Sequence, residues 1–364
     1  IIAAFVIFLI ASFVQSVIRG LIGSLSSSGT QILQGLGIHP LIISLMVSES
    51  GIFGALSTIF QLLPVVFLFF VLMSYSERSG LFPRIADKLN TLLGKIGLQG
   101  EIFFPLTLSL GCNVVGARAF GFEKNGSLRA VYVCLNSYVP CSARIVVVAS
   151  LLSLITPNAV VSAILLFTFI VVGYGLVLSQ AALFTRLLGR GDVQLLSQLP
   201  SFEIPSFNGV VSMAWTQTSS FISKATKIII PGTVVIWFFS LGGDSSILGY
   251  LGRSLNVIFF PIGFDWQMTL ALIFGFVAKE NTLATLQTLY GGLNQLASST
   301  TYPTMVAFVT FFAFYVPCLP TVIAIKNEVH SWRKTMLAVI LNVATAYLLA
   351  AIAFVLTIII LTMI

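Results

Sequence analysis

The sequence contains one tetrapeptide twice, as Tyr138-Val139-Pro140-Cys141 and as Tyr315-Val316-Pro317-Cys318. Tyr, Pro and Cys occur only 9, 13 and 4 times in 364 residues, so the recurrence indicates an internal repeat. Both copies lie inside long apolar runs. A Pro inside an apolar helix removes a backbone hydrogen bond and bends the helix, which frees a carbonyl that needs another partner. We therefore expect a thiol beside loosened backbone at two equivalent places, an arrangement suited to removing water from a soft or borderline cation.

The composition is typical of a polytopic membrane protein. Hydrophobic residues make up 57% of the chain, charged residues only 8%, and the mean hydropathy is +1.05. Soluble domains carry about 25% charged residues. The net charge of +7 could suit a nucleic-acid partner, but the basic residues form no single stripe and we expect no nucleic acid. The segments that reach the ~20 apolar residues of a membrane span include residues 52–73, 130–151, 159–184, 304–325 and 335–364.

The basic residues separate by membrane side, and they are concentrated on the cytoplasmic side of a membrane protein. Of the 18 Lys and Arg residues, fourteen fall on the expected inner side, Arg19 and Arg253 on the outer side, and Arg144 and Lys279 at membrane depth. An amphipathic helix is expected on the inner surface over residues 82–96. The other loops expected there are residues 118–129 and 326–334.

Two short apolar segments are interrupted in their middle and are predicted to dip into the membrane and return. The interruptions are Gly111-Cys112-Asn113 and Lys279-Glu280. Each half then has the order span, re-entrant segment, span with the tetrapeptide, span, and the halves run in opposite directions, as in many secondary transporters. The predicted fold is all-α, a polytopic membrane protein of about seven spans plus two re-entrant segments in two inverted repeats. The expected organisation is a first span and external segment (1–50), a first repeat (51–190), a linker (191–215) and a second repeat (216–364).

Five motifs follow one another along the chain, and together they are specific. They are Gly-Cys-Asn-Val at 111–114, Pro-Cys-Ser-Ala-Arg at 140–144, Ala-Lys-Glu at 278–280, Thr-Leu-Gln-Thr-Leu-Tyr-Gly at 285–291, and Tyr-Val-Pro-Cys at 315–318 before Ser331-Trp332. In this order they resemble the membrane domain of the FeoB ferrous-iron transporters. The resemblance implies two Gate-type repeats, uptake of Fe(II) across the prokaryotic inner membrane, and functional cysteines at Cys112, Cys141 and Cys318.

The chain departs from this family in two ways. Members usually have Pro after Gly-Cys-Asn-Val, where this chain has Val115. They also carry an N-terminal GTPase domain, whereas this sequence contains no Gly-x-x-x-x-Gly-Lys-Ser/Thr motif. We therefore expect that the chain itself is not an enzyme and that GTP acts only through a GTPase domain absent from this sequence. The expected partners are the lipid bilayer and a cytoplasmic GTPase domain or small accessory protein, and a homo-oligomer is left open.

The predicted metal ligands combine thiol, carboxylate and amide groups. A lone buried Cys is usually a small apolar filler, and Cys134 is interpreted in that way. For the other three cysteines the repeat and the motifs favour a ligand role, with a disulfide between Cys141 and Cys318 as the alternative. Glu280 is expected to bind or compensate the cation, because a charge at membrane depth is costly and is a functional hypothesis by default. Asn113 either donates an oxygen ligand or caps the re-entrant turn.

Other polar residues receive structural interpretations. Lys279 is expected to be structural, and Arg144, which would repel an iron ion, is expected to bind freed carbonyls in a structural or gating role. His39 and His330 are expected on opposite surfaces, so no His serves as a base for a nucleophilic Cys. This argues against a membrane enzyme. The other rival is a Gate-type carrier of nucleosides or another organic solute, whose site would need polar and aromatic side chains.

Overall fold

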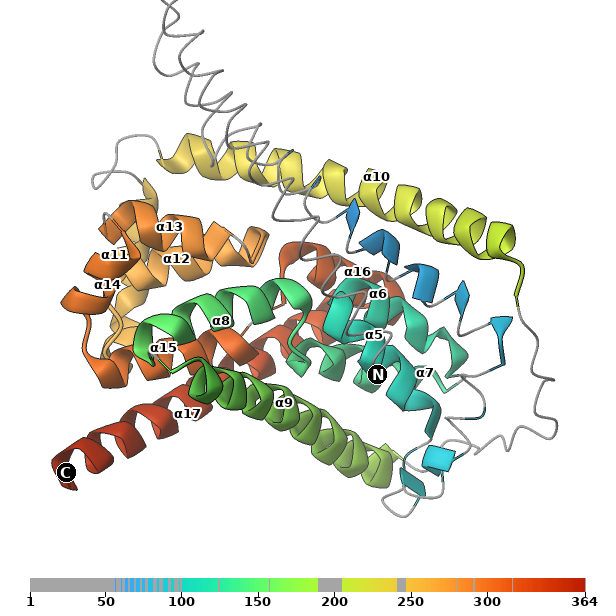
Figure 1. Ribbon diagram of the computed structural model, residues 1–364, viewed down its shortest axis with the longest axis horizontal. Coiled ribbons are helices and arrows are strands. Elements are labelled where there is room, and N and C mark those ends of the chain that lie inside the picture. Colours follow the sequence, from blue (N-terminus) through green and yellow to red (C-terminus); the bar gives the residue numbers. More distant parts are fainter. Residues whose placement is uncertain are drawn as a thin grey trace, which may run out of the picture. The chain divides into compact units, whose positions relative to one another are not determined.

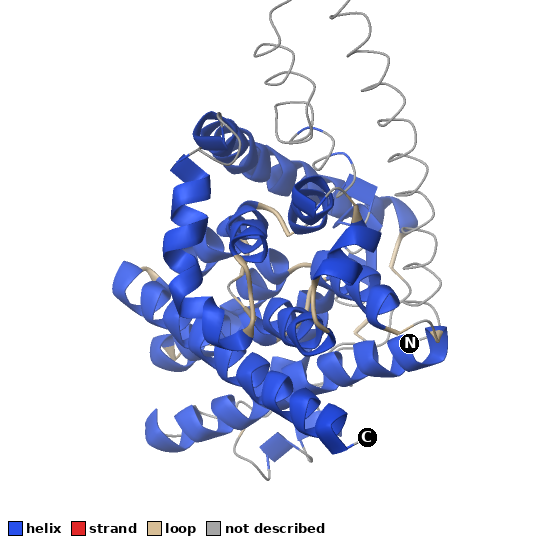
Figure 2. Cartoon of the chain, turned by 90° about the vertical axis from the view of Figure 1, so that its left-hand side faces the viewer, coloured by secondary structure: helices blue, strands red, loops and turns tan. Residues whose placement is uncertain are grey.

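The computed structural model describes residues 100–123, 125–156, 158–188, 205–240, 247–279, 281–290, 292–315 and 317–363, together with scattered positions between 56 and 98. Throughout these residues the secondary structure is helical, with turns and short extended connections and no strand (Figure 2). The all-α prediction is confirmed for this part of the chain. The predicted first span and external segment (1–50) and most of residues 52–73 lie outside it.

The described helices are arranged along the chain in two similar series (Figure 1). The first series is η2 (Gly100–Ile102), α5 (Phe103–Gly111), α6 (Asn113–Ala119), η3 (Phe120–Phe122), α7 (Gly126–Leu135), η4 (Asn136–Tyr138), α8 (Ser142–Ile155) and α9 (Ala159–Leu188). The second is α11 (Ile247–Phe259), η6 (Phe260–Ile262), α12 (Trp266–Val277), α13 (Asn281–Tyr290), α14 (Leu293–Ser299), α15 (Tyr302–Phe314), α16 (Leu319–Val329) and α17 (Trp332–Met363). Each series contains a pair of short helices joined at a break, a longer helix broken at the tetrapeptide, and a long unbroken helix.

Four described helical segments are long and apolar enough to cross a membrane, and a fifth crossing results if one bent helix pair counts as a single span. The four are Gly126–Ile155, Val160–Arg186, Tyr302–Val329 and Trp332–Met363, and the bent pair is Gly249–Ile262 with Trp266–Val277. They agree with the predicted spans 130–151, 159–184, 304–325 and 335–364. The total of about seven spans and the two re-entrant segments stay predictions.

Contacts divide the chain into two compact units, residues 1–85 with 196–241 and residues 86–195 with 242–364. The second unit contains both tetrapeptides and both series of helices. The described part of the first unit contains α10 (Phe207–Ser240), which has Pro231 in its interior. The predicted linker 191–215 is therefore helical from Phe207 onward. The predicted repeat boundaries are not tested by this division.

The expected outer loop around Arg253 is a helix, α11, followed by a sharp turn. The helices before and after the turn make an angle of 109°. Gly263 adopts φ +81° there, a left-handed conformation that favours glycine. The Arg253 guanidinium lies over the ring of Trp266, 5.3 Å from its centroid, and so holds α11 against the start of α12. The charge pattern predicted only an outer loop here, and this tertiary contact explains why the segment is a helix.

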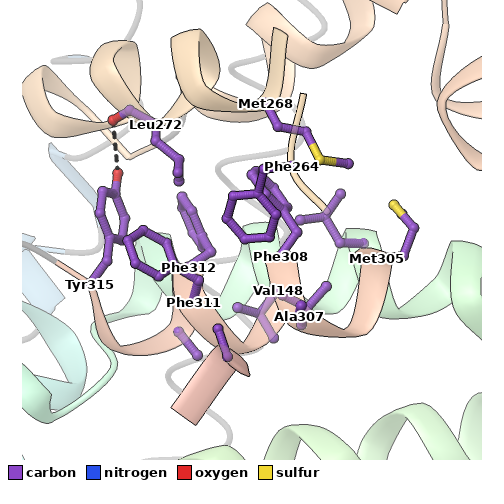
Figure 3. Packing of buried hydrophobic residues seen from close by; sticks show 14 of the residues in the cluster. Val148, Phe264, Met268, Leu272, Met305, Ala307, Phe308, Phe311, Phe312 and Tyr315 are labelled. Atoms are coloured by element: carbon purple, nitrogen blue, oxygen red, sulfur yellow. Dashed lines mark hydrogen bonds between the residues drawn. The ribbon is translucent and has the colours of Figure 1, made fainter. Parts of the chain in front are cut away.

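The core of the second unit is built around α15. Its aromatic side chains Phe308, Phe311 and Phe312 face Leu272 of α12 and Phe264, which lies just before α12, as Figure 3 shows. Val148 of α8 packs in the same cluster, and α8 lies along α15 (Figure 1). In the apolar 18-residue stretch of the segment Tyr302–Val329, 76% of the residues are buried, against 11% in the corresponding stretches of α9 and α17. The helix pair with the second tetrapeptide is therefore internal, whereas α9 and α17 leave most of their apolar surface for lipid or another chain.

Candidate metal site

The first break in the helices is at Cys112. This residue has extended dihedrals, φ −155° and ψ 120°, and separates α5 from α6. Its amide still bonds to the Leu108 carbonyl, at 3.0 Å, and its carbonyl accepts from the amides of Val115 and Gly116. Cys112 thus lies at the tip of a tight helical pair, even though Val115 replaces the Pro that the family usually has.

Each tetrapeptide separates two helices, and in both copies the next helix begins directly after the Cys. In the first copy η4 ends at Tyr138 and α8 begins after Cys141; in the second, α15 ends just before Tyr315 and α16 begins after Cys318. Both cysteines are N-caps in the extended region, with ψ 167° and 157°, and neither side chain forms a capping hydrogen bond. The prediction that the helix opens at the Pro before each thiol is confirmed. Each thiol lies at the N-terminal, partially positive end of a helix.

The remaining break separates α12 from α13. Ala278 is extended, and Lys279 is 2% exposed. The Lys279 ammonium lies 3.4 Å from the centroid of the Tyr315 ring and 5.4 Å from that of Phe312. A buried ammonium over two aromatic faces is stabilised by cation–π attraction, which supports the structural role expected for Lys279. Glu280 itself lies outside the described residues, so its place relative to the thiols stays a prediction.

Arg144 connects the two tetrapeptide breaks. Its side chain is fully buried, with 0% exposure. One terminal nitrogen donates to the carbonyls of Ser137 and Ala313, both at 3.0 Å, and the other donates to the carbonyl of Tyr315 at 2.9 Å. These carbonyls belong to the helix ends that the breaks interrupt. One of them, the Ala313 carbonyl, is the acceptor that Pro317 leaves free four residues before it. The expected binding of Arg144 to carbonyls at the breaks is therefore confirmed.

Ser142 connects the break at Cys112 to the break at Cys141. Its hydroxyl donates to the carbonyl of Gly111 at 2.9 Å. Because Ser142 and Arg144 are both in the first turn of α8, one helical turn joins three breaks that lie far apart in the sequence. No role was predicted for Ser142, although its position directly after Cys141 could have indicated that its hydroxyl lies at the break.

The three cysteines at these breaks are brought together. Cys112, Cys141 and Cys318 lie close enough to interact electrostatically with one another, and the Sγ of Cys318 lies 3.1 Å from the Thr321 hydroxyl. All four cysteines of the chain are free thiols in the structure. In the described segments, no group of three or more His, Cys, Asp or Glu side chains is arranged to hold a metal ion. The three thiols therefore interact electrostatically, but they are not placed as the ligand set of one metal ion in the described part of the chain.

Asn113 has an oxygen without a partner. Its side chain is 3% exposed, and the described residues offer no hydrogen bond to its Oδ1. Its backbone carbonyl accepts from the Asn136 side chain at 2.9 Å. A buried amide oxygen without a partner is costly, and it does not act as the cap of α6, whose N-cap is Cys112. The Asn113 Oδ1 is therefore without a partner among the described residues, and its role as an oxygen ligand stays a prediction.

Glycines let polar groups approach the breaks closely. Gly116 in α6 lies against Ser109, and Gly275 in α12 lies against Thr282 and Tyr315, so closely that a Cβ atom would collide in either place. Each glycine is paired with a hydroxyl residue seven positions away on the other side of a break, Ser109 for Gly116 and Thr282 for Gly275. These contacts were not predicted, because the spacing of the motifs does not indicate them.

His330 does not provide a base for the thiols. It ends α16 in a left-handed conformation, φ 55°, and its ring contacts the Glu328 carbonyl. Cys318 begins the same helix, about 18 Å away at the rise of an α-helix. The surface interpretation of His330 agrees with the structure, and His39 lies outside the described residues.

These features define a helical membrane protein in which two series of broken helices bring thiols together at their breaks. The Gate family, described as "Nucleoside recognition", matches residues 59–155 and 222–332, more than half of the chain, and the chain belongs to this family.

Among curated proteins, the chain is similar to the Fe(2+) transporter FeoB of Staphylococcus aureus strain MSSA476, with 28% identity over 342 residues, 90% of this chain and 51% of the relative. The FeoB of Methanocaldococcus jannaschii is 28% identical over 322 residues, 82% of this chain and 48% of the relative. A Porphyromonas gingivalis relative, 24% identical over 363 residues, is named a fusion of Fe(2+) transport protein A with FeoB. The chain spans about half the length of these relatives and corresponds to their transmembrane part. No solved structure matches it.

Proposed function

We propose that the chain forms a pathway for Fe(II) across the prokaryotic inner membrane and that Cys112, Cys141 and Cys318 line it. Asn113 and Glu280 supply oxygen ligands in this proposal. The observation that carries it is the convergence of three cysteines from three separate helix breaks. The names of the relatives, which describe Fe(2+) transporters, supply the identity of the ion.

The chemistry of the breaks suits a borderline cation. Thiols and amide oxygens together make a mixed ligand set of the kind that Fe(II) accepts. A conducting site must also release its ion, so binding should be moderate rather than tight. Thiols without a complete ligand set agree with such a site, because the last ligands can come from water or from a change in conformation.

The arrangement in the membrane is part of the same proposal. About seven spans and two re-entrant segments form two inverted repeats, with α5–α6 and α12–α13 as the re-entrant pairs. The repeated order of broken pair, broken helix and long helix supports it. The start of α7 and the end of α16 face the cytoplasm, where a GTPase domain or small accessory protein would bind. The name of the P. gingivalis fusion protein motivates the accessory partner.

Cysteine replacement tests the pathway. The purified chain is reconstituted in vesicles, and Fe(II) entry is followed with an enclosed chelating dye. Replacing Cys141 or Cys318 with Ser keeps the size but removes the soft ligand, so Fe(II) entry should fall sharply. Cys134→Ser is the matched control, because Cys134 lies within α7 and is not at a break. Wild-type rates in both test variants, at equal protein level, would show that the thiols are not pathway ligands.

A nucleoside carrier is the second candidate, motivated by the description of the matching family. Such a site needs polar groups that converge on the base and ribose, with aromatic faces free to stack. The Tyr315 ring is covered by the Lys279 ammonium, and this argues for the metal pathway. Uptake of radiolabelled uridine into the same vesicles, unaffected by the Cys→Ser changes, would favour the nucleoside carrier instead.

A further inference from the structure

Arg144 brings to the thiols a positive charge that no described carboxylate neutralises. The guanidinium is fully buried, and it donates to the carbonyls of Ser137 and Tyr315, four residues before Cys141 and three residues before Cys318. All of its hydrogen bonds go to neutral carbonyl groups. In the part of the chain that the structure describes, no carboxylate forms an ion pair with it. Its Nε has no hydrogen-bond partner there either.

Two helix ends add to this positive potential. Cys141 and Cys318 are the N-caps of α8 and α16, which are 14 and 11 residues long. The N-terminus of a helix carries roughly half a positive charge from its aligned peptide dipoles. Arg144 and both helix ends therefore favour negative groups at the place where the thiols meet. The Lys279 ammonium over the Tyr315 ring adds to this potential. The charges of the described groups at this place therefore repel a cation, and the Glu280 carboxylate, which lies outside the described residues, is not part of this sum.

The way in which a metal is bound decides how strongly this field opposes it. A divalent metal held by two thiolates forms a unit of no net charge, since the thiol protons leave when the metal binds. Arg144 then interacts with it only weakly. A divalent metal held by neutral carbonyl and amide oxygens keeps its double charge and is repelled fully, because a buried charge is poorly screened. In other channels, too, an Arg side chain can act as an electrostatic barrier to cations.

We propose that Arg144 is a specificity-determining residue, whose fixed charge excludes metals that bind only through oxygen and admits those that bind through sulfur. The excluded class comprises Mg(II), Ca(II) and, largely, Mn(II), which prefer carboxylate, carbonyl and water ligands. This inference rests on the proposed function, because it assumes that Cys141 and Cys318 bind the transported metal. It gives Arg144 a task beyond joining the two breaks.

Metal competition on the purified chain tests the proposal without requiring transport. Co(II) is the probe for sulfur binding, since its thiolate complexes give a charge-transfer absorption band, and Mn(II) is the oxygen-preferring competitor. In wild-type protein, Mn(II) should displace Co(II) poorly. In Arg144→Gln, the Co(II) affinity should change little, while the Mn(II) concentration needed for displacement should fall about tenfold or more, because the repulsion is lost.

Arg144→Lys separates charge from hydrogen-bond geometry. It keeps the positive charge but cannot reproduce the planar guanidinium and its three carbonyl contacts. If charge sets the specificity, Arg144→Lys should retain the wild-type resistance to Mn(II), even if its thermal stability falls. A purely structural role predicts instead that Lys and Gln lower stability together and leave the Co(II)-to-Mn(II) preference unchanged, and that result would overturn the proposal.

A second pair of variants covers the case in which Arg144→Gln does not fold. Thr321, whose hydroxyl lies 3.1 Å from the Cys318 sulfur, can be replaced by Asp or by Asn. The two side chains have the same shape. Only Asp offsets the positive charge, and it also adds a carboxylate of the kind that Mn(II) prefers. Thr321→Asp should then admit Mn(II) and Thr321→Asn should not; equal behaviour would refute the charge argument. A missing Co(II) band together with missing Fe(II) entry in wild-type protein would contradict the proposed function itself.

Discussion

Replacing Gly275 with Ala should strain the packing between α12, α13 and the second tetrapeptide. The new Cβ would collide with the Thr282 hydroxyl, and it would lie 2.6 Å from the Tyr315 hydroxyl, closer than real Cβ contacts. Thr282 is 0% exposed and has little room to move. Overpacking of this kind costs about 1 to 3 kcal/mol. The same change gains about 1 kcal/mol because Ala is the better helix former, so the net loss should be about 0 to 2 kcal/mol.

Gly175→Ala isolates the collision from the helix preference. Gly175 is also inside a helix, α9, but nothing lies within 4 Å of a Cβ placed there. The stability difference between the two variants should therefore be about 1 to 3 kcal/mol, or roughly 5- to 150-fold in the ratio of folded to unfolded protein. The stability of the two variants can be compared by thermal unfolding in detergent, in which the fraction of monodisperse protein is measured at each temperature.

The double variant Gly275→Ala with Thr282→Ala tests the named contact. Thr282→Ala removes the hydroxyl that meets the new Cβ, so the two changes should be non-additive by about 1 kcal/mol or more. Because the carbonyl of Tyr315 holds Arg144, Fe(II) entry should fall in the single variant and recover in part in the double variant. Equal stability of the Gly275 and Gly175 variants, or strict additivity with Thr282→Ala, would show that this close approach does not constrain the helices.

Three further outcomes are expected. Arg129 of α7 forms an ion pair with Glu328 of α16, so reversing either charge should reduce Fe(II) entry and reversing both should restore it. A double-mutant cycle should give a coupling free energy of about 0.2 to 1 kcal/mol, as expected for a partly exposed pair. A coupling of zero would contradict the prediction. Ser142→Ala should cost about 1 kcal/mol, since a carbonyl loses its donor, whereas Ser150→Ala, which removes an exposed bond within one helix, should cost less in the same unfolding assay. Burial raises the pKa of Glu101 above 4.5, so the charged carboxylate is disfavoured in the folded state. Glu101→Gln should therefore be more stable than wild type at neutral pH, and the difference in stability should shrink as the pH falls toward 4.5. A difference that does not depend on pH would contradict this prediction.

The repeated tetrapeptide carried most of what the sequence could predict. Pro removes a hydrogen-bond donor wherever it lies in a helix, so two helix breaks followed by a thiol could be expected from local chemistry alone. The long apolar runs predicted the four described spans for the same kind of reason, since a membrane span depends on length and hydropathy. The expected role of Arg144 also followed, because a charge at membrane depth needs partners and freed carbonyls were the nearest candidates.

Other features could not be derived in this way. The Ser142 contact to Gly111 and the hydroxyl groups at Gly116 and Gly275 join segments that are separated along the chain. Serine and glycine are common in membrane helices, so neither residue type signals such a contact by itself. The helix around Arg253 was likewise missed, since it is held by a contact with Trp266.

The sequence by itself determined that the chain is helical, that it suits a membrane, and that two helices break at Pro140 and Pro317, because these properties depend on hydropathy and on the covalent chemistry of proline. The sequence already predicted Cys112, Cys141 and Cys318 as ligands of one site, but only the tertiary structure decided that one turn of α8 joins their breaks. It also decided that Arg144 lies near Cys141 and Cys318 and that no carboxylate among the described residues forms an ion pair with it. These properties depend on how buried hydrogen bonds between distant segments are satisfied, which is settled only when the helices pack together.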